Sequence, residues 1–291
     1  MNVKELKAVN PAISIVTPSF NMIEYLRLCH ASVLDQGVSF EHIVMDGGST
    51  DGTVDWLSKQ KIEWVSERDH GMYNALNKAI EKSTGEIIGH LNCDEQYLPG
   101  VLQFAIDFFV EHPDVDFIAA DFLVVDPSGE FVAYRKSFQP KWPYFFSNYL
   151  YTNTCTLFYR RKIFRECRFD ESYRSIADVI FLYHVIKKGF KGEHVKKYFA
   201  TFTYSGDNLS LNPISSVEKK KFLNTLPVWY RVARPIFFIF FFIERILSKS
   251  YIESSSLSYS IFRSADLTKR VTVTRQNPGY YVKFESSKSL K

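Results

Sequence analysis

The stretch Ile87-Ile88-Gly89-His90-Leu91-Asn92-Cys93-Asp94-Glu95 reads as an apolar strand that runs directly into two adjacent carboxylates. Carboxylates at the end of a buried strand lose hydration, so they are costly to the fold unless another group uses them. Asp94 and Glu95 provide hard oxygen ligands, which suit Mg²⁺ or Mn²⁺ bridging phosphate groups. A solvated turn without a ligand is the alternative, and this stretch alone leaves both interpretations open.

Strand and helix patterns alternate from about residue 12 to residue 120. Apolar strands are predicted at residues 13–17, 42–46, 62–67, from residue 87, and at 115–120, with helices near residues 24–34, 53–58, 72–80 and 98–111. Gly85 is expected to stop the third helix in a left-handed conformation. This order predicts an α/β fold with a Rossmann-like, mostly parallel, doubly wound central sheet and helices on both faces.

Four of these strands end in polar or glycine-rich clusters. The clusters are Thr17-Pro18-Ser19-Phe20-Asn21, Asp46-Gly47-Gly48-Ser49-Thr50-Asp51-Gly52, Glu67-Arg68-Asp69-His70-Gly71 and Asn92-Cys93-Asp94-Glu95. Ligands of open parallel sheets bind beyond the carboxyl ends of the strands, so we expect the clusters to form one site. The second cluster matches neither the dinucleotide fingerprint nor a P-loop, which disfavours both folds. Its carboxylate can accept a hydrogen bond from a base or ribose, but a tight turn that caps the next helix explains the same residues.

The pattern changes after residue 120. A hairpin is predicted from residues 122–125 and 131–134, followed by an aromatic stretch at residues 142–151 and a helix at residues 179–188. Residues 196–213 look irregular. Residues 270–275 and 280–284 flank Asn277-Pro278-Gly279 as the strands of a hairpin flank a turn.

Composition describes an ordinary folded protein. The 291 residues are 46% hydrophobic and 23% charged, and the net charge of +4 is too small to indicate nucleic-acid binding. This charge suits an anionic small substrate or an anionic membrane. Four cysteines without metal-finger spacing favour free thiols in a reducing compartment, and the first residues lack the apolar segment of a signal peptide. We therefore expect a cytoplasmic protein.

Four ordered motifs make the sequence resemble glycosyltransferase family 2, the inverting sugar-nucleotide enzymes of GT-A fold. They are Thr17-Pro18-Ser19-Phe20-Asn21, Asp46-Gly47-Gly48-Ser49-Thr50-Asp51-Gly52-Thr53, Asp69-His70-Gly71-Met72-Tyr73-Asn74-Ala75-Leu76-Asn77-Lys78 and Leu91-Asn92-Cys93-Asp94-Glu95. The resemblance covers roughly residues 12–210. It implies a GT-A catalytic domain at residues 1–215, with a nucleotide-binding half at about 12–120 and an acceptor half at about 121–215. Residues 216–291 would form a C-terminal helical and aromatic extension.

The resemblance also implies roles for single residues. The nucleotide-binding residues would be Thr17, Ser19, Asn21, Asp46, Arg68, Asp69, Asn77, Asn92 and Cys93. Asp94 and Glu95 would hold Mg²⁺ or Mn²⁺. The family has D-x-D where this chain has Asn92-Cys93-Asp94, so one carboxylate is missing. This weakens the metal site more than the nucleotide site, because the diphosphate supplies ligands as well.

An inverting displacement needs a base that deprotonates the acceptor hydroxyl. Asp178, in Ile176-Ala177-Asp178-Val179, resembles the catalytic carboxylate of the family, just before an apolar helix. Capping of that helix is the alternative role, and the two roles can coexist. Residues 205–210 resemble the loop that closes over the substrates in this family, although a loop without function would look the same.

Residues 236–243 are eight consecutive apolar residues, five of them Phe. A membrane span needs about 20 apolar residues, so this segment is too short to cross a bilayer. Arg231, Arg234, Arg245 and Lys249 flank it, which suits a helix that lies on an anionic membrane. A helix that packs in the core or in a dimer is the alternative.

Taken together, these features predict an enzyme, an inverting and metal-assisted glycosyltransferase. It would move a hexosyl or N-acetylhexosaminyl group from a nucleoside diphosphate sugar to a hydroxyl of a saccharide or lipid-linked saccharide in surface polysaccharide synthesis. UDP is the nucleotide by family habit, and the inner face of the cell membrane is a further predicted partner. Two alternatives stay open: an inactive nucleotide-sugar-binding module, and an α/β scaffold that recruits partners or membrane.

Overall fold

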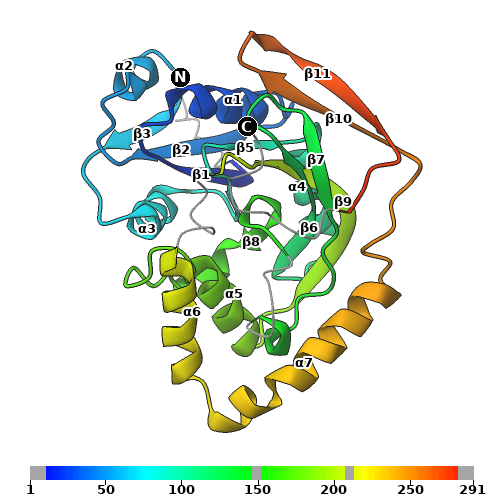
Figure 1. Ribbon diagram of the computed structural model, residues 1–291. Helices are drawn as coiled ribbons and strands as arrows, with labels where there is room; N and C mark the ends of the chain where they lie inside the picture. Colours follow the sequence, from blue (N-terminus) through cyan, green and yellow to red (C-terminus); the bar gives the residue numbers. More distant parts are fainter. Residues whose placement is uncertain (1–10, 146–151, 207–212, 281–291) are drawn as a thin grey trace, which may run out of the picture.

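The computed structural model describes residues 11–145, 152–206 and 213–280. Its centre is a nine-stranded mixed sheet in the order β3-β2-β1-β4-β8-β6-β9-β5, with β7 paired to β6 (Figure 1). The strands β10 and β11 form a separate two-stranded sheet. The predicted α/β fold is therefore confirmed, with antiparallel strands mixed into its second half.

The first half of the sheet is parallel and follows the predicted order. Its strands are β1 (Ile13–Ser19), β2 (Phe40–Asp46), β3 (Glu63–Ser66) and β4 (Ile87–His90), and its helices are α1 (Ile23–Leu34), α2 (Thr53–Leu57) and α3 (Met72–Lys82). The predicted role of Gly85 is wrong, because its φ is not positive and α3 has already ended at Lys82. A Cβ at Gly85 would lie 2.6 Å from Ser14 Oγ and 2.7 Å from Ser14 N, so the glycine allows the chain to approach β1 closely.

The second half of the sheet is mixed. Its elements are β5 (Glu95–Tyr97), α4 (Val101–Glu111), β6 (Phe117–Val125), β7 (Phe131–Arg135), β8 (Phe158–Arg160), α5 (Ala177–Lys187) and β9 (Gly192–Thr203), with short 3-10 helices η1 (Trp142–Tyr144), η2 (Thr154–Thr156) and η3 (Arg161–Arg165). The predicted β6–β7 hairpin is confirmed. The prediction that residues 196–213 are irregular is wrong for residues 196–203, because β9 pairs along β6 and also with β5, and residues 207–212 lie outside the described residues. Such long-range pairing leaves little trace in a local pattern.

Helices cover both faces of the sheet, as predicted, because neighbouring side chains of each strand point to opposite sides. Val16, Ile88 and Phe117 belong to a core shared with α3 and α5. Ile15 and Ile87 belong to a second core shared with α1 and α4. These two cores hold the parallel strands in place.

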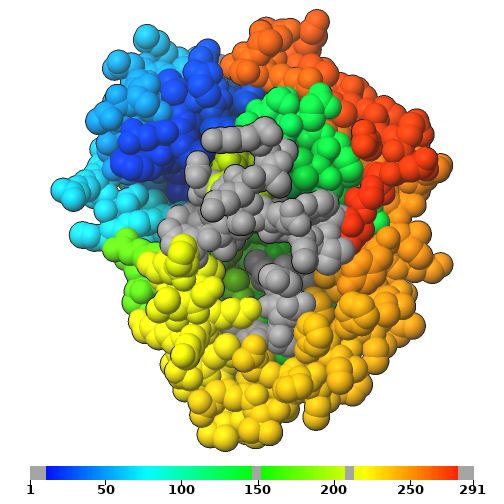
Figure 2. Space-filling view, in the orientation of Figure 1, coloured from blue at the N-terminus to red at the C-terminus, as the bar shows by residue number. Residues whose placement is uncertain are grey.

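The chain ends with helices α6 (Pro213–Thr225) and α7 (Val228–Leu247), then β10 (Ser256–Arg263) and β11 (Asp266–Gln276). Figure 2 shows α6 and α7, in yellow to orange, along the bottom of the molecule. The predicted hairpin around Asn277 is wrong for residues 270–275, which pair with β10 instead, and residues 281–284 lie outside the described residues. Among the described helices, none has the length and apolar character needed to cross a membrane.

Candidate active site

Four strand ends meet at one edge of the sheet, as predicted. The parallel register pairs Ser19 with Asp46 and Asp46 with Ser66, and it pairs Val16 with His90. Two backbone hydrogen bonds extend this pairing past the strands, from Gly47 N to Ser19 O at 2.8 Å and from Glu67 N to Asp46 O at 3.0 Å. We call this edge, with the loops that follow β1 to β4, the rim.

Asp46 stands at the centre of the rim and is almost fully buried. Its Oδ2 accepts hydrogen bonds from Gly48 N at 3.1 Å, Ser49 N at 2.9 Å and Ser66 Oγ at 2.6 Å. Its Oδ1 accepts one from Ser49 Oγ at 2.5 Å. Four donors from the protein therefore surround this carboxylate, and they fix the loop between β2 and α2.

Asn21 joins the first two rim loops. Its backbone N donates to Ser49 Oγ at 2.7 Å, and its Oδ1 accepts from Thr50 N at 2.8 Å, at a φ of 50°. Ser19 Oγ is buried and has no hydrogen-bond partner among the described residues. Thr17, in contrast, is fully buried, and a hydrogen bond of 2.9 Å joins its Oγ1 to His42 Nε2. The prediction of Thr17 as a pocket-lining side chain does not fit this geometry, because the hydroxyl faces the core.

The loops after β1, β2 and β3 meet at Gly47, which lies between Phe20 and Asp69. We call this place the mouth of the rim. A Cβ at Gly47 would lie 3.2 Å from Asp69 Oδ2 and 3.2 Å from a Phe20 ring carbon. Asp69 Oδ1 accepts a hydrogen bond from Gly71 N at 2.8 Å, which fixes the start of α3. Phe20 is 58% exposed, so its ring presents an apolar face beside polar groups. Arg68 precedes Asp69 and is exposed.

The turn after β4 closes on itself. Asn92 N donates to Glu95 Oε2 at 2.8 Å, and His90 Nε2 donates to Asn92 Oδ1 at 2.9 Å. Glu95 is fully buried and starts β5, and burial raises the pKa of its carboxyl, helped by the nearby Asp94 charge. Glu95 Oε2 is thus held by the Asn92 backbone amide, while Glu95 lines the same small cavity as Asp94, and its role as a metal ligand stays a prediction. Cys93 Sγ faces inward, 3.6 Å from Met22 Sδ.

Asp94 is the less buried of the two carboxylates in this turn. It lines a small cavity of about 40 Å³ together with Tyr25, Asp126, Thr203 and Arg263. Burial raises the pKa of Asp94. No group of three or more His, Cys, Asp or Glu side chains among the described residues could hold a metal ion. A cation at Asp94 would have few protein ligands and would take further ligands from phosphate oxygens, an arrangement typical of Mg²⁺.

Asp178 lies in the first turn of α5 and accepts a hydrogen bond from Tyr73 OH at 3.0 Å. Burial raises the pKa of the Asp178 carboxyl, while the Val179 amide and the Tyr73 hydroxyl lower it. Tyr73 belongs to the first turn of α3, directly after the third rim loop. The Tyr73 hydroxyl therefore links Asp178 to the helix that follows the third rim loop.

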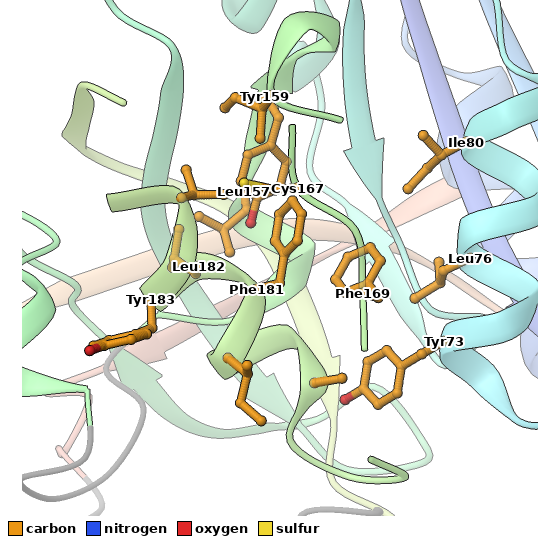
Figure 3. Close-up of a cluster of buried hydrophobic side chains, with 14 of the residues drawn as sticks. Tyr73, Leu76, Ile80, Leu157, Tyr159, Cys167, Phe169, Phe181, Leu182 and Tyr183 are labelled. Atoms are coloured by element: carbon orange, nitrogen blue, oxygen red, sulfur yellow. The ribbon is translucent and has the colours of Figure 1, made fainter. Parts of the chain in front are cut away.

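An aromatic cluster lies between Asp178 and the turn after β4, and Figure 3 shows three of its members, Tyr73, Phe169 and Phe181. The Tyr73 ring stacks on Phe169 with centroids 5.7 Å apart, and Phe169 meets the His90 ring edge-on at 6.3 Å. Phe169 also stacks on Phe181 of α5 at 4.5 Å. Since His90 bonds Asn92, contacts run without a break from Asp178 to the Asn92 turn. We call Tyr73, His90, Phe169 and Phe181 the aromatic bridge.

Asn77 supports the aromatic bridge from α3. Its Nδ2 donates to Phe169 O at 2.9 Å and Glu171 Oε1 at 2.8 Å, while its Oδ1 accepts from Phe169 N at 3.1 Å. Asn74 Nδ2 donates to Glu171 Oε2 at 2.8 Å. These contacts give Asn77 a structural role, and they do not support the prediction that it lies near a nucleotide.

A larger cavity of about 240 Å³ lies elsewhere, between α3 and the segment that contains η3. Arg161, Arg165 and Arg168 line it together with Asn77 and Glu81. Arg161 is held by Gly85 O and Ser83 Oγ, and Arg168 pairs with Glu81. Asn77 is the one predicted site residue that lines this cavity. This cavity is therefore not the candidate active site, although it is the larger of the two.

Several residues at the site had no role in the sequence analysis. Tyr73 and Phe20 stood inside quoted motifs without an assigned function, and His90 counted as part of the strand. Arg263 reaches the Asp94 cavity from the tip of the β10–β11 hairpin, more than 160 residues away in the chain, and no local signal predicts this. In the loop predicted at residues 205–210, residues 207–210 lie outside the described residues.

Comparison with sequence families and relatives agrees with this geometry. A family model described as Glycosyl transferase family 2 matches residues 14–168. Chondroitin synthase of Pasteurella multocida (strain Pm70) is 24% identical over 223 residues, 73% of this chain and 23% of that protein. The putative teichuronic acid biosynthesis glycosyltransferase TuaG of Bacillus subtilis (strain 168) is 36% identical over 110 residues, 35% of this chain and 43% of that protein. The chain spans less than half the length of these relatives.

Solved structures show the same fold. The mannosyltransferase PcManGT of Pyrobaculum calidifontis, in complex with GDP-Man and Mn²⁺, has a TM-score of 0.55 at 14% identity, covering 85% of this chain and 77% of that chain. S. aureus TarS 1-349, in complex with UDP-GlcNAc, has a TM-score of 0.54 at 20% identity, covering 69% of this chain and 61% of that chain. At these identities the likeness shows the fold alone.

Proposed function

The chain belongs to glycosyl transferase family 2, and from this membership we propose that it is an inverting glycosyltransferase with a nucleoside diphosphate sugar as donor. The observation that carries the proposal is the placement of Asp178. Its carboxylate is half-buried, accepts a hydrogen bond from the Tyr73 hydroxyl, and is joined to the rim by the aromatic bridge. A carboxylate with few donors and a raised pKa suits a general base.

The rim is proposed to bind the nucleotide. Ser19 Oγ is a buried hydroxyl without a partner in the described part of the chain, and Phe20 is an exposed ring beside it. Asp69 and Arg68 border the same mouth. A free hydroxyl, an aromatic face and a cation are groups that recognise a base, a ribose and a diphosphate. Asp46 and Asn21 would act mainly by holding the loops that carry these groups.

The proposed reaction is a single displacement. Asp178 takes the proton of the acceptor hydroxyl while the acceptor oxygen forms a bond to the anomeric carbon of the donor sugar. The bond between that carbon and the diphosphate oxygen breaks, and the nucleoside diphosphate leaves as an anion. A Mg²⁺ or Mn²⁺ ion held by Asp94 and the diphosphate would stabilise this leaving charge.

The proposal also names the nucleotide of the donor and the class of acceptor. UDP is supported by TarS, solved with UDP-GlcNAc, whereas PcManGT was solved with GDP-Man. The names of the relatives refer to chondroitin and to teichuronic acid biosynthesis, which supports a saccharide or lipid-linked saccharide acceptor in surface polysaccharide synthesis. The cytoplasmic location predicted above is part of the same proposal.

A thermal-shift panel tests the donor. UDP-, GDP- and dTDP-sugars are added to the full chain, each with and without Mn²⁺ or Mg²⁺. A bound donor at about 100 times its Kd raises the free energy of unfolding by about 2.7 kcal/mol, which is a shift of about 5 °C or more. We expect this shift for UDP-sugars and a larger one with metal. A panel without any shift would contradict the proposal.

The stereochemical outcome tests the reaction. The anomeric coupling of the product, read by NMR with a UDP-sugar donor and a saccharide acceptor, should show inverted configuration. A product that retains the donor configuration would exclude the single displacement at Asp178, even if donor binding is confirmed.

A further inference from the structure

Helix α7 has one face that is fixed to the protein. Tyr230 and Phe241 are its buried residues. Tyr230 OH donates to Pro143 O at 2.9 Å, and the Phe241 ring lies 5.4 Å from Phe138. Glu244 accepts hydrogen bonds from Lys141 Nζ at 2.9 Å and Tyr144 OH at 2.7 Å. These contacts hold the helix in one rotational position.

The opposite face of α7 is apolar and exposed. Nine side chains, 45% to 76% exposed, make up this face, which we call the α7 stripe: Val228, Trp229, Val232, Ile236, Ile239, Phe240, Ile243, Ile246 and Leu247. They recur every three to four residues, so they form one continuous line along a 20-residue helix. A contiguous apolar patch of this extent on a folded protein marks an interaction surface.

Charges around the stripe have one sign. Arg231 is exposed on α7 and Lys249 follows the helix, while α6, the helix before it, carries three consecutive lysines at residues 219–221, of which Lys221 lies over the Tyr173 ring. The only acidic residues of α6 and α7 are Glu218 and Glu244. Both are engaged by protein donors, Glu218 by the Arg174 and Ser175 amides and Glu244 by Lys141 and Tyr144. The stripe therefore has basic neighbours and no free acidic ones on these helices.

We propose that the α7 stripe docks onto an anionic phospholipid membrane, with α7 lying in the plane of the bilayer surface. The apolar side chains enter the region between headgroups and acyl chains, and the lysines and arginines meet lipid phosphates. A second copy of the chain is a poorer occupant, because a symmetric contact through this face brings the same basic residues together. The length of the apolar stripe and the positive charge of the residues near it both favour an anionic membrane as the partner.

In this orientation α5, the helix with the candidate base, lies behind α7 on its buried side. Trp142 packs between Tyr230 of α7, at 5.6 Å, and Tyr183 of α5, at 6.3 Å. Helix α5 bears Asp178 in its first turn. A lipid-linked acceptor would thus arrive on the side of α5. This last step rests on the proposed function, whereas membrane docking itself does not.

Vesicle flotation tests the docking. The full chain is mixed with vesicles of phosphatidylglycerol and phosphatidylcholine, or of phosphatidylcholine alone, and the floated fraction is measured. Strong binding is expected for the anionic vesicles. The I236E/I243E variant should lose at least about tenfold in partitioning, because each change removes an apolar side chain from the lipid. The matched control L34E/V110E changes two side chains that are 55% and 75% exposed on other helices, and it should bind as the wild type.

A charge pair tests the electrostatic part. The R231E/K220E variant should bind anionic vesicles about tenfold more weakly, while K59E/K61E, with the same change in net charge, should not. All four variants should keep the wild-type melting temperature, since the changed side chains are exposed. Wild-type protein that stays unbound with anionic vesicles overturns the proposal. So does a dimer, seen by light scattering, that I236E/I243E converts to monomer, since it makes a second copy the occupant. Neither result depends on transferase activity.

Discussion

Asp46 in the rim and Asp178 in α5 are aspartates at candidate functional positions, the first buried and the second half-buried, and their surroundings differ. Asp46 accepts four hydrogen bonds, two from backbone amides and two from the hydroxyls of Ser49 and Ser66. Asp178 accepts from one side chain, Tyr73, and from the backbone amides of Val179 and Asp178, and its other neighbours are largely aromatic and aliphatic. Two identical side chains are thus prepared for different tasks.

The difference in hydrogen-bond donors indicates that Asp46 has a structural role and Asp178 a chemical one. A carboxylate whose lone pairs are filled by protein donors is stabilised as an anion and holds a loop in place. A carboxylate that is desolvated and has few donors is a stronger base, because its protonated form is favoured more. The rim is therefore built to present a rigid surface to the donor, and the α5 turn is built to accept a proton.

The strongest test of this comparison is the Asp178→Asn variant. We expect turnover to fall by about 10³-fold, because a positioned general base contributes factors of this order. The amide keeps an oxygen for Tyr73 OH, so the fold is expected to survive. Initial rates with a UDP-sugar and acceptor measure the effect, and thermal unfolding serves as the control. Turnover within tenfold of wild type would remove Asp178 from the reaction.

The complementary test is the Asp46→Ala variant. This change removes the group that accepts four hydrogen bonds, and it should lower the free energy of unfolding by about 3 kcal/mol. Each hydrogen bond to a charged group is worth about 1.5 to 3 kcal/mol, but the donors left behind partly find other partners. Urea unfolding measures it. Asp107→Ala, an exposed site on α4, is the matched control and should stay within about 0.5 kcal/mol. An Asp46 variant as stable as this control would show that the network does not hold the rim.

The Tyr73→Phe variant refines the account of Asp178. Tyr73 OH donates to the charged form of Asp178, so its removal raises the pKa of that carboxyl further. The base is then protonated at a higher pH, and the acidic limb of the pH–rate profile moves towards neutral pH. At acidic pH the rate should fall about tenfold, the equivalent of one charge-assisted hydrogen bond. An unmoved limb would mean that the hydroxyl only packs.

The rim could be predicted from the sequence because its signals are local. Each of β1, β2, β3 and β4 is a short apolar run followed at once by polar residues, and parallel pairing then brings the four ends together. The direction of single side chains could not be predicted in this way. Thr17 and Ser19 lie on the same side of β1, but Thr17 is two residues further from the strand end and its hydroxyl bonds His42 in the core. Glu95 is fully buried because it starts β5, which pairs with β9 far along the chain.

The C-terminal part shows where local patterns mislead. The Asn277-Pro278-Gly279 turn signal suggested a hairpin, yet β10 pairs with β11 around residues 264 and 265. The alternation of the buried residues Leu257, Tyr259 and Ile261 was the better signal for this strand. The attachment of the hairpin to Gln96 and Gly129 depends on contacts across more than 120 residues, which no periodicity contains.

The most direct test of the central claim, that donor binding and proton transfer lie in separate regions, is calorimetric titration of the Asp178→Asn variant. The titrant is the nucleotide sugar that gives the largest thermal shift, with Mn²⁺ present. The account predicts a Kd within about threefold of the wild-type value, because the rim is unchanged. A folded Asp178→Asn protein that binds this donor more than about tenfold less tightly would contradict it.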